Sequence, residues 1–507
     1  MLPAATKPYS FIQQQAPVER NLFDTPASQK YSGLWLIPGL LAAVYLGWLV
    51  STAGIPLAGL LLGLPFGVAF VWGVFRYPKA GLIAALCYGF GMPYINRHFP
   101  GPQYGLALDG LLVLSWLGVL FYQGNRFRWR HLHNDLVWLM VAWMGLTVLE
   151  IANPSRPNLQ GWLQEMRGSA LYWFLTVPLV FFVFNRKRDI NVFLHLIIAW
   201  SLLGALYGAK QLHLGVDGAE RAWLEAGAKR THILFGKLRV FSFYAESAQF
   251  GASQGALAVS CLILAAGPYK GLKKLGYALA GAVIFYGMLI SGTRGAMGAL
   301  LGGGLVFLVL SKQLRSLLVG LVVFGAFLGM LKFTTIGNNN DQIRRLRSSV
   351  NPNDPSLLVR LNNQAILRES LKTKPFGTGV GTIGMWGVTF NKHIYTSAIP
   401  PDSLYVKNWV MYGVVGFTIW LGIMLYIIGK AAGLVWRTRD PALRNQMMAL
   451  CAGAFGLLVC SYGNEVMNQM PSVLVVAVSW ALLWLCQRWD TPAPGPAPQQ
   501  AVLEAPF

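Results

Sequence analysis

The chain has 507 residues, of which 55% are hydrophobic and only 12% are charged, and its formal net charge is +22. Soluble domains carry roughly a quarter charged residues, and the apolar residues of this chain come in runs too long for one soluble core. A soluble globular protein is therefore excluded. The excess of Lys and Arg indicates contact with anionic membrane lipids rather than with nucleic acid.

Apolar runs of about 20 residues can cross the hydrocarbon layer, where only helices and closed barrels satisfy the backbone. Residues 1–33 are expected to be a cytoplasmic tail, since the first apolar run starts too late for a cleavable signal peptide. Eleven transmembrane helices are expected in residues 34–333, near 34–52, 55–75, 79–95, 106–122, 134–151, 170–184, 191–213, 247–266, 274–290, 294–311 and 315–333. Three more in residues 404–487, near 404–428, 446–462 and 471–487, complete an all-α polytopic membrane protein with about fourteen (12–14) such helices. Residues 488–507 are expected to be a disordered cytoplasmic tail.

Basic residues cluster at alternate connections between these helices. Under the positive-inside rule, this pattern places both termini in the cytoplasm. The clusters are Arg76/Lys79, Arg126/Arg128/Arg130, Arg186/Lys187/Arg188, Lys270/Lys273/Lys274, Lys312/Arg315 and Lys430/Arg437/Arg439/Arg444.

No pattern in the sequence predicts a metal or another cofactor. The five cysteines lie in apolar stretches without CxxC spacing, so we interpret them as buried thiols. His131 and His133 lie among cytoplasmic arginines, with no carboxylate or cysteine at ligand spacing.

Two long connections, residues 214–246 and 334–403, fall on the outer side of the membrane and are basic. Long loops are translocated regardless of their charge, which is one explanation. An anionic ligand held at the outer face is the other.

The longer loop contains a predicted helix. Asp354 and Pro355 are a helix start signal, and Pro375 followed by Gly377 is a stop. At about 100° per residue, Arg360, Gln364 and Arg368 lie within about 80° of one another. This face suits a phosphate, and a solvated helix face is the equally open alternative.

Three further segments carry charged residues at the outer membrane surface. Arg294, in a glycine-flanked turn between two predicted helices, is costly at that depth unless it is paired or binds a ligand, and ligand binding is favoured over snorkelling. Arg239 and Glu246 lead into the helix at 247, and Glu246 is either a base or the neutralising partner of a nearby cation. Asp402 and Lys407 begin the helix at 404, where Asp402 is either an N-cap or part of an active site.

The glycines at 379, 381 and 384 form a GxGxxG pattern. A dinucleotide site would need a preceding strand and a βαβ unit, and neither is predicted here. The stretch is interpreted as a tight turn behind the arginine-bearing helix.

Four segments in this order resemble the bacterial O-antigen ligase and polymerase family. They are RVFSFYAESAQFGA from Arg239, SGTRGA from Ser291, the stretch from Arg360 through KPFGTGVGT, and PDSLYVKNWVMYGVVG from Pro401. The resemblance covers about residues 235–420 and includes the long external loop before the last three helices.

The resemblance implies an inverting, metal-independent glycosyltransferase of the C type in the bacterial inner membrane. It would act at the periplasmic face on glycans attached to undecaprenyl pyrophosphate, with a glycan or lipid A core as the acceptor and other polysaccharide assembly proteins as further partners. By the match, Arg239 and Arg294 correspond to the family's essential arginines, and Arg360 is a further loop cation. Arg368 and Lys407 complete the expected pyrophosphate-binding group.

One position departs from the family pattern. Family ligases carry a His-Asn pair where this chain has Asp402 and Ser403, and that His is their proposed base. The base is therefore Asp402, or His393, or absent, with Glu246 as a further candidate, and Arg294 completes the expected catalytic group. The departure favours a polymerase of surface polysaccharide or exopolysaccharide repeats over a lipid A core ligase.

Two other functions were weighed against the enzyme. A transporter or flippase for a lipid-linked glycan would bury its charges near the bilayer midplane, whereas here they lie at or beyond the outer surface. A noncatalytic subunit of a secretion complex would tolerate loss of the external arginines.

Overall fold

The structure is a computed structural model that describes residues 36–53, 55–122, 129–234, 236–312 and 354–490, with isolated positions between 318 and 347. The expected tail at 1–33, most of the expected helix at 315–333, and residues 491–507 of the expected C-terminal tail lie outside the described residues. The chain divides into two compact units, Met1–Trp72 and Gly73–Phe507. Helices α2 (Leu36–Ala53) and α3 (Ile55–Arg76) correspond to the first two expected spans.

The second unit contains a bundle of long helices. In chain order they are α4 (Pro78–His98), α5 (Tyr104–Leu117) with η1 (Gly118–Tyr122), α6 (Asp135–Leu149) with η4 (Glu150–Ala152), α7 (Leu159–Met166), η5 (Arg167–Leu171), α8 (Tyr172–Val183), α9 (Lys187–His213), α12 (Ser247–Ala266), α13 (Gly271–Ile290), α14 (Ala296–Leu310), α19 (Leu404–Arg437), α20 (Pro441–Cys460) and α21 (Ser472–Leu485), followed by η9 (Cys486–Arg488).

Within the described residues, eight helices are long and apolar enough to cross a membrane, and three shorter apolar helices accompany them. The expectation of an all-α polytopic membrane protein is therefore confirmed, whereas the count of fourteen and the C-type arrangement stay predictions. The span expected at 170–184 begins earlier, because α7, η5 and α8 form one stretch, Leu159–Val183. Its polar residues Glu165 and Arg167 are paired with Lys407 and Asp109, so they do not end the helix.

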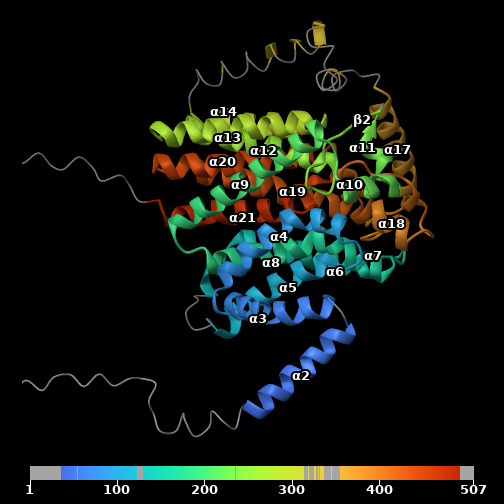
Figure 1. Cartoon of the computed structure of the whole chain (residues 1–507). Coiled ribbons are helices and arrows are strands. Elements are labelled where there is room, and N and C mark those ends of the chain that lie inside the picture. The colour runs from blue at the N-terminus through green and yellow to red at the C-terminus, as the bar shows by residue number, and fades with distance from the viewer. Residues whose placement is uncertain are drawn as a thin grey trace, which may run out of the picture. The chain divides into compact units, whose positions relative to one another are not determined.

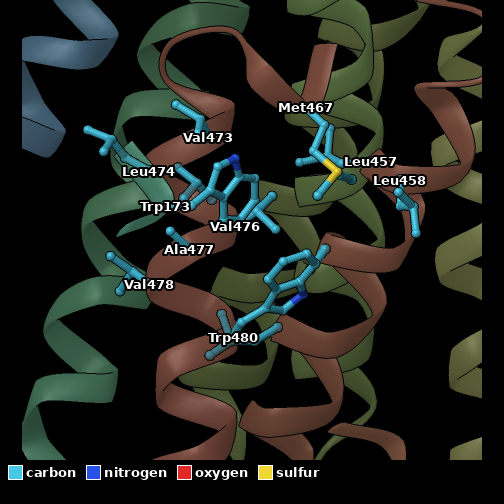
Figure 2. Close-up of a cluster of buried hydrophobic side chains, with 14 of the residues drawn as sticks. Trp173, Leu457, Leu458, Met467, Val473, Leu474, Val476, Ala477, Val478 and Trp480 are labelled. Atoms are coloured by element: carbon cyan, nitrogen blue, oxygen red, sulfur yellow. The ribbon is translucent and has the colours of Figure 1, made fainter. Parts of the chain in front are cut away.

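Small residues let the central helices approach closely. Helix α14 packs on α20, where a Cβ added at Gly456 would lie 2.4 Å from the carbonyl oxygen of Ala299. Trp173 of α8 stacks on Trp480 of α21 with ring centroids 4.9 Å apart, and Figure 2 shows this pair among the aliphatic side chains of the core. Such contacts drive helix association in lipid, where burying apolar surface against lipid tails gains little.

The two long loops fold into short elements. Residues 214–246 contain α10 (Gly218–Trp223), η6 (Leu224–Ala228), α11 (Lys229–His232) and an antiparallel pair of two-residue strands, β1 (Ile233–Leu234) and β2 (Lys237–Leu238). Residues 354–403 contain α17 (Pro355–Leu371), α18 (Gly384–Phe390) and η7 (Tyr395–Ala398). Helices α10, α11, α17 and α18 gather at one end of the bundle, with α17 running across the direction of α13 and α14 (Figure 1). We call residues 214–246 and 354–403, with the helix ends beside them, the loop end.

A break in α19 anchors the second loop. Gly413 has φ +65°, and the carbonyls of Val410 and Met411 accept hydrogen bonds from the amides of Thr378 and Gly379, both at 2.9 Å. A side chain at 413 would clash with Pro375, since its Cβ would lie 2.0 Å from that carbonyl oxygen. The GxGxxG stretch thus forms turns that insert into α19, and no strand directly precedes it.

Candidate functional site

The charged residues singled out in the sequence lie at the loop end, where α13 and α20 end and α12, α14, α19 and α21 begin. The connection between α20 and α21, residues 461–471, includes η8 (Val466–Asn468) and runs through this region. Charges placed at helix ends avoid the cost of burial at the bilayer midplane.

Arg294 lies in the turn between α13 and α14, and its Nη1 is 2.6 Å from Oδ2 of Asp354. Asp354 also caps α17, because its Oδ1 accepts a hydrogen bond from the amide of Leu357 at 3.2 Å. The predicted start of the loop helix is therefore confirmed, and its cap is held by the predicted ligand-binding arginine. The turn packs tightly, since a Cβ at Gly251 would lie 2.4 Å from Oγ of Ser291.

Arg239 reaches the same turn from the first long loop. Its Nη2 donates to Oγ1 of Thr293 at 3.2 Å, and its Nη1 donates to the carbonyl of Thr231 at 3.0 Å. Thr293 in turn donates to the carbonyl of Ser247 at the start of α12. These bonds place Arg239 against the turn that carries Arg294.

The two arginines of helix α17, Arg360 and Arg368, differ in burial. Leu367 and Leu371 are buried and form the packing face, and Arg360 lies on the same face, half-buried. Nη1 of Arg360 is 3.8 Å from the position of a Cβ at Gly463, and Gly295, next to Arg294, borders the same glycine. Arg360 makes no hydrogen bond or ion pair with the residues that the structure describes. The two arginines of the predicted phosphate-binding face therefore differ. Arg360 lies near Arg294, while Arg368 is exposed.

Lys407, which was predicted to bind the pyrophosphate, forms ion pairs with two glutamates. Its Nζ is 2.8 Å from Oε2 of Glu165 and 2.6 Å from Oε2 of Glu465. Two carboxylates around one ammonium leave no positive charge for an anion. Neither glutamate was predicted from the sequence, although a lysine three residues inside a membrane helix signals a carboxylate nearby.

Glu246 precedes α12 and accepts a hydrogen bond from Nε2 of Gln469 at 2.9 Å. Burial raises the pKa of Glu246 above its ordinary value and the charge of Glu465 raises it further, while the Gln469 hydrogen bond and Arg239 lower it. Glu246 was expected to be either a base or the neutralising partner of a nearby cation. In the structure its hydrogen bond comes from a side-chain amide and not from a cation.

Asp402 is not the helix cap. That position belongs to Ser403, whose Oγ accepts from the amide of Val406. Asp402 is half-buried at φ +50°, a conformation that side chains rarely adopt, and it makes no polar contact with the described residues. Its turn lies beside α17, because Asn363 donates to the carbonyl of Pro400 at 3.4 Å, and beside the α20–α21 connection, because Leu404 donates to Ser461 at 3.0 Å.

His393, the other candidate base, is exposed and makes no polar contact with the described residues. Its neighbour Asn391 is buried against α7, where it accepts a hydrogen bond from the amide of Asn158 at 2.7 Å. The structure therefore does not bring His393 to the arginine group through any contact. Within the described part of the chain, no group of three or more His, Cys, Asp or Glu residues is placed to hold a metal ion.

Residues 279–421 match the model of a protein family described as O-antigen ligase. Over this segment, which is less than a third of the chain, the protein is similar to that family. A search of curated proteins found no match. The matched segment includes Arg294, Arg360 and Asp402, so the resemblance is confirmed for three of its four motifs, while the motif from Arg239 precedes the matched residues.

The apolar helices and the similarity of residues 279–421 to the O-antigen ligase family indicate an integral membrane protein. They support a glycosyl-transferring enzyme in the assembly of O-antigen or a related polysaccharide. The matched segment contributes Arg294, Asp354, Arg360 and Lys407 to the loop end, and the rest of the chain contributes Arg239, Glu165, Glu246 and Glu465.

Proposed function

We propose that the protein is an inverting membrane glycosyltransferase of the C type that polymerises undecaprenyl-pyrophosphate-linked oligosaccharide repeats at the periplasmic face of the bacterial inner membrane. The observation that carries the proposal is the convergence of Arg239, Arg294 and Arg360 from three separate segments at one end of the bundle. Both termini are placed in the cytoplasm by the distribution of basic residues at the opposite membrane edge.

The chemistry needs a cation group for the donor and a base for the acceptor. The acceptor hydroxyl oxygen attacks the anomeric carbon, the bond from that carbon to the phosphate oxygen breaks, and the pyrophosphate leaves with the electron pair. Arginines stabilise this developing charge and bind phosphate oxygens in bidentate fashion, so a metal is not needed for that role. Asp402, a half-buried carboxylate without a partner among the described residues, would take the hydroxyl proton.

Ligation of the glycan to lipid A core is the second candidate. The description of the matched family favours it. The presence of Asp402 where family ligases carry the His favours polymerisation instead. A transporter or flippase is the weaker proposal, since the arginine group lies at helix ends rather than at the midplane.

The test is glycan transfer in proteoliposomes with an undecaprenyl-pyrophosphate-linked repeat unit, with lipid A core supplied or withheld. Wild-type protein is expected to form ladders without lipid A core, and Arg294→Ala to lower their rate by about 100- to 1000-fold, the usual cost of losing a group that stabilises transition-state charge. Asp402→Asn should lower the rate by about 100-fold, as for loss of a general base.

Asp354→Asn is the matched control for Arg294. Asparagine is as good a helix cap as aspartate, so this variant keeps the cap of α17 and removes only the carboxylate charge. Transfer within about threefold of wild type is expected. Equal losses in Asp354→Asn and Arg294→Ala would mean that the arginine only anchors α17. Product that requires lipid A core would establish the ligase, and donor binding without product would favour the transporter.

A further inference from the structure

The group formed by Lys407, Glu165 and Glu465 carries more negative charge than its lysine needs. Both carboxylates contact the same ammonium, at 2.8 and 2.6 Å. Glu165 alone would balance Lys407. With all three side chains ionised the group therefore keeps one negative charge, and a carboxylate in a partly buried site is retained at a desolvation cost.

The two carboxylates have different surroundings. The Glu165 side chain is 6% exposed and the Glu465 side chain is 24% exposed. Glu465 uses Oε2 for Lys407, and its Oε1 receives no hydrogen bond from the described residues. Gly384 borders this side of the pair, since a Cβ there would lie 3.7 Å from both Oε1 of Glu465 and Nζ of Lys407. The glycine, which its φ of +72° favours, places no side chain over the pair.

The α20–α21 connection places Glu465 next to the donor cations without pairing it to any of them. Gly463, two residues earlier, adjoins Arg360, and Gln469, four residues later, holds Glu246. The charges of Glu465 and Glu246 are close enough to affect each other. The connection thus leads from the arginine group toward a second, acidic group.

The first turn of α19 carries another polar side chain that the chain does not satisfy. Asn408 is 1% exposed, and both its Nδ2 and Oδ1 lack a hydrogen-bond partner within the described residues. An unpaired buried amide is costly, so a hydroxyl-bearing ligand or water is the kind of partner it requires. Asn408 follows Lys407 directly and lies about 100° further round the helix.

We infer that Glu465, held by Lys407 and Glu165, binds hydroxyl groups of the acceptor sugar beside the donor site. Sugar hydroxyls donate to a carboxylate oxygen, and the excess negative charge repels the donor pyrophosphate, which keeps the acceptor in this group and the donor at the arginines. The inference rests on the proposed transferase function and adds the acceptor side of the site.

The experiment measures KM separately for donor and acceptor, with the purified full chain in detergent, a lipid-pyrophosphate-linked repeat as donor and a free oligosaccharide repeat as acceptor. The free oligosaccharide carries no pyrophosphate, so its KM does not report on the arginines. Glu465→Gln is expected to raise the acceptor KM by about tenfold or more, the worth of a hydrogen bond to a charged group, and to leave the donor KM within about twofold. Glu369→Gln, an exposed glutamate on α17, should change neither.

Glu165→Gln separates acceptor binding from folding. Glu165 is the more buried of the two carboxylates, 6% exposed against 24%, so its loss should lower the thermal unfolding midpoint more than Glu465→Gln does. An unchanged acceptor KM in Glu465→Gln, or a parallel rise in donor KM, would overturn the inference. If Glu465→Gln does not fold, Glu465→Asp, which keeps the charge and shortens the side chain, must raise the acceptor KM, and its failure to do so would also overturn it. Wild-type protein that binds donor but transfers to no acceptor would instead refute the proposed function.

Discussion

The two ends of the helical bundle are both basic, but they use their cations differently. At the end opposite the loops, each of three lysines pairs with one aspartate at the start of a helix, and we call it the lysine end. The pairs are Lys79 with Asp189 of α9, Lys187 with Asp440 at the N-cap of α20, and Lys430 with Asp135 of α6. Each aspartate lies where the helix dipole favours a negative charge.

At the loop end the charges are not matched one to one. Arg360 has no partner among the described residues, and Lys407 has two. Arg294 does bind a capping aspartate, yet its side chain remains 31% exposed. The comparison indicates that the three pairs at the lysine end are complete in themselves, whereas Arg360, Lys407 and its two glutamates form an uneven arrangement that a charged donor and a hydroxyl-bearing acceptor can complete.

The largest effect is expected at the anchor of the loop end. Gly413→Ala should destabilise the protein by about 3 kcal/mol or more, because alanine is strained at φ +65° and its Cβ would meet the Pro375 carbonyl at 2.0 Å. Thermal unfolding in detergent measures this. Gly422→Ala, in the same helix with no atom within 4 Å of its Cβ, is the control and should not destabilise. Similar midpoints for the two variants would contradict the anchoring role of the break.

The next effect concerns the unbalanced arginine. Arg360→Ala should weaken donor binding by about 10- to 100-fold, as expected for removal of a charge-assisted phosphate contact. Arg368→Ala on the same helix is exposed and should change binding by less than about twofold. Titration with the lipid-linked donor compares them, and equal losses would mean that α17 attracts the donor only through its overall charge.

A third effect concerns how the stability of the loop end depends on pH. Burial, with the nearby charges of Arg239 and Arg97, lowers the pKa of His232 in α11 to about 4, although its bond to the Ala228 carbonyl raises it. The unfolded chain binds that proton near pH 6.5, so stability falls as the pH decreases from about 6.5 to about 4, by about 2 kcal/mol at pH 5.

His232→Asn should therefore flatten this acid loss in the unfolding midpoint. The same variant at pH 7.5, where both states are neutral at this position, gives the packing cost of the substitution alone. An acid loss as steep as in wild type would show that His232 is not its source.

The smallest effect is expected at the lysine end. Lys187→Gln should lower stability by less than about 1 kcal/mol and leave transfer within about twofold, because an exposed ion pair contributes little. Asp440→Ala should cost more, since Asp440 also accepts from the amides of Ala442 and Leu443 as the cap of α20. A large loss of transfer in Lys187→Gln would remove the functional distinction between the ends.

Much of the loop end could be located from the sequence, because its signals are local. Arg294 is conspicuous beside an apolar run, and the Asp354–Pro355 start signal placed α17 close to its observed bounds. The assignment of roles was less accurate. Arg368 shares the predicted face with Arg360 but lies at its edge and is exposed, since the burial of Leu367 and Leu371 orients the helix.

The sequence by itself determined the membrane class, most of the helices and the arginines that lie beside apolar runs, because hydropathy over about 20 residues and a cation next to an apolar run are properties of a short segment. Only the tertiary structure decided which charges meet. Lys407 finds Glu165 and Glu465, Arg294 finds Asp354, and Glu246 finds Gln469. These partners lie on different helices and loops, and their pairing follows from the close packing of the bundle, which no local pattern encodes.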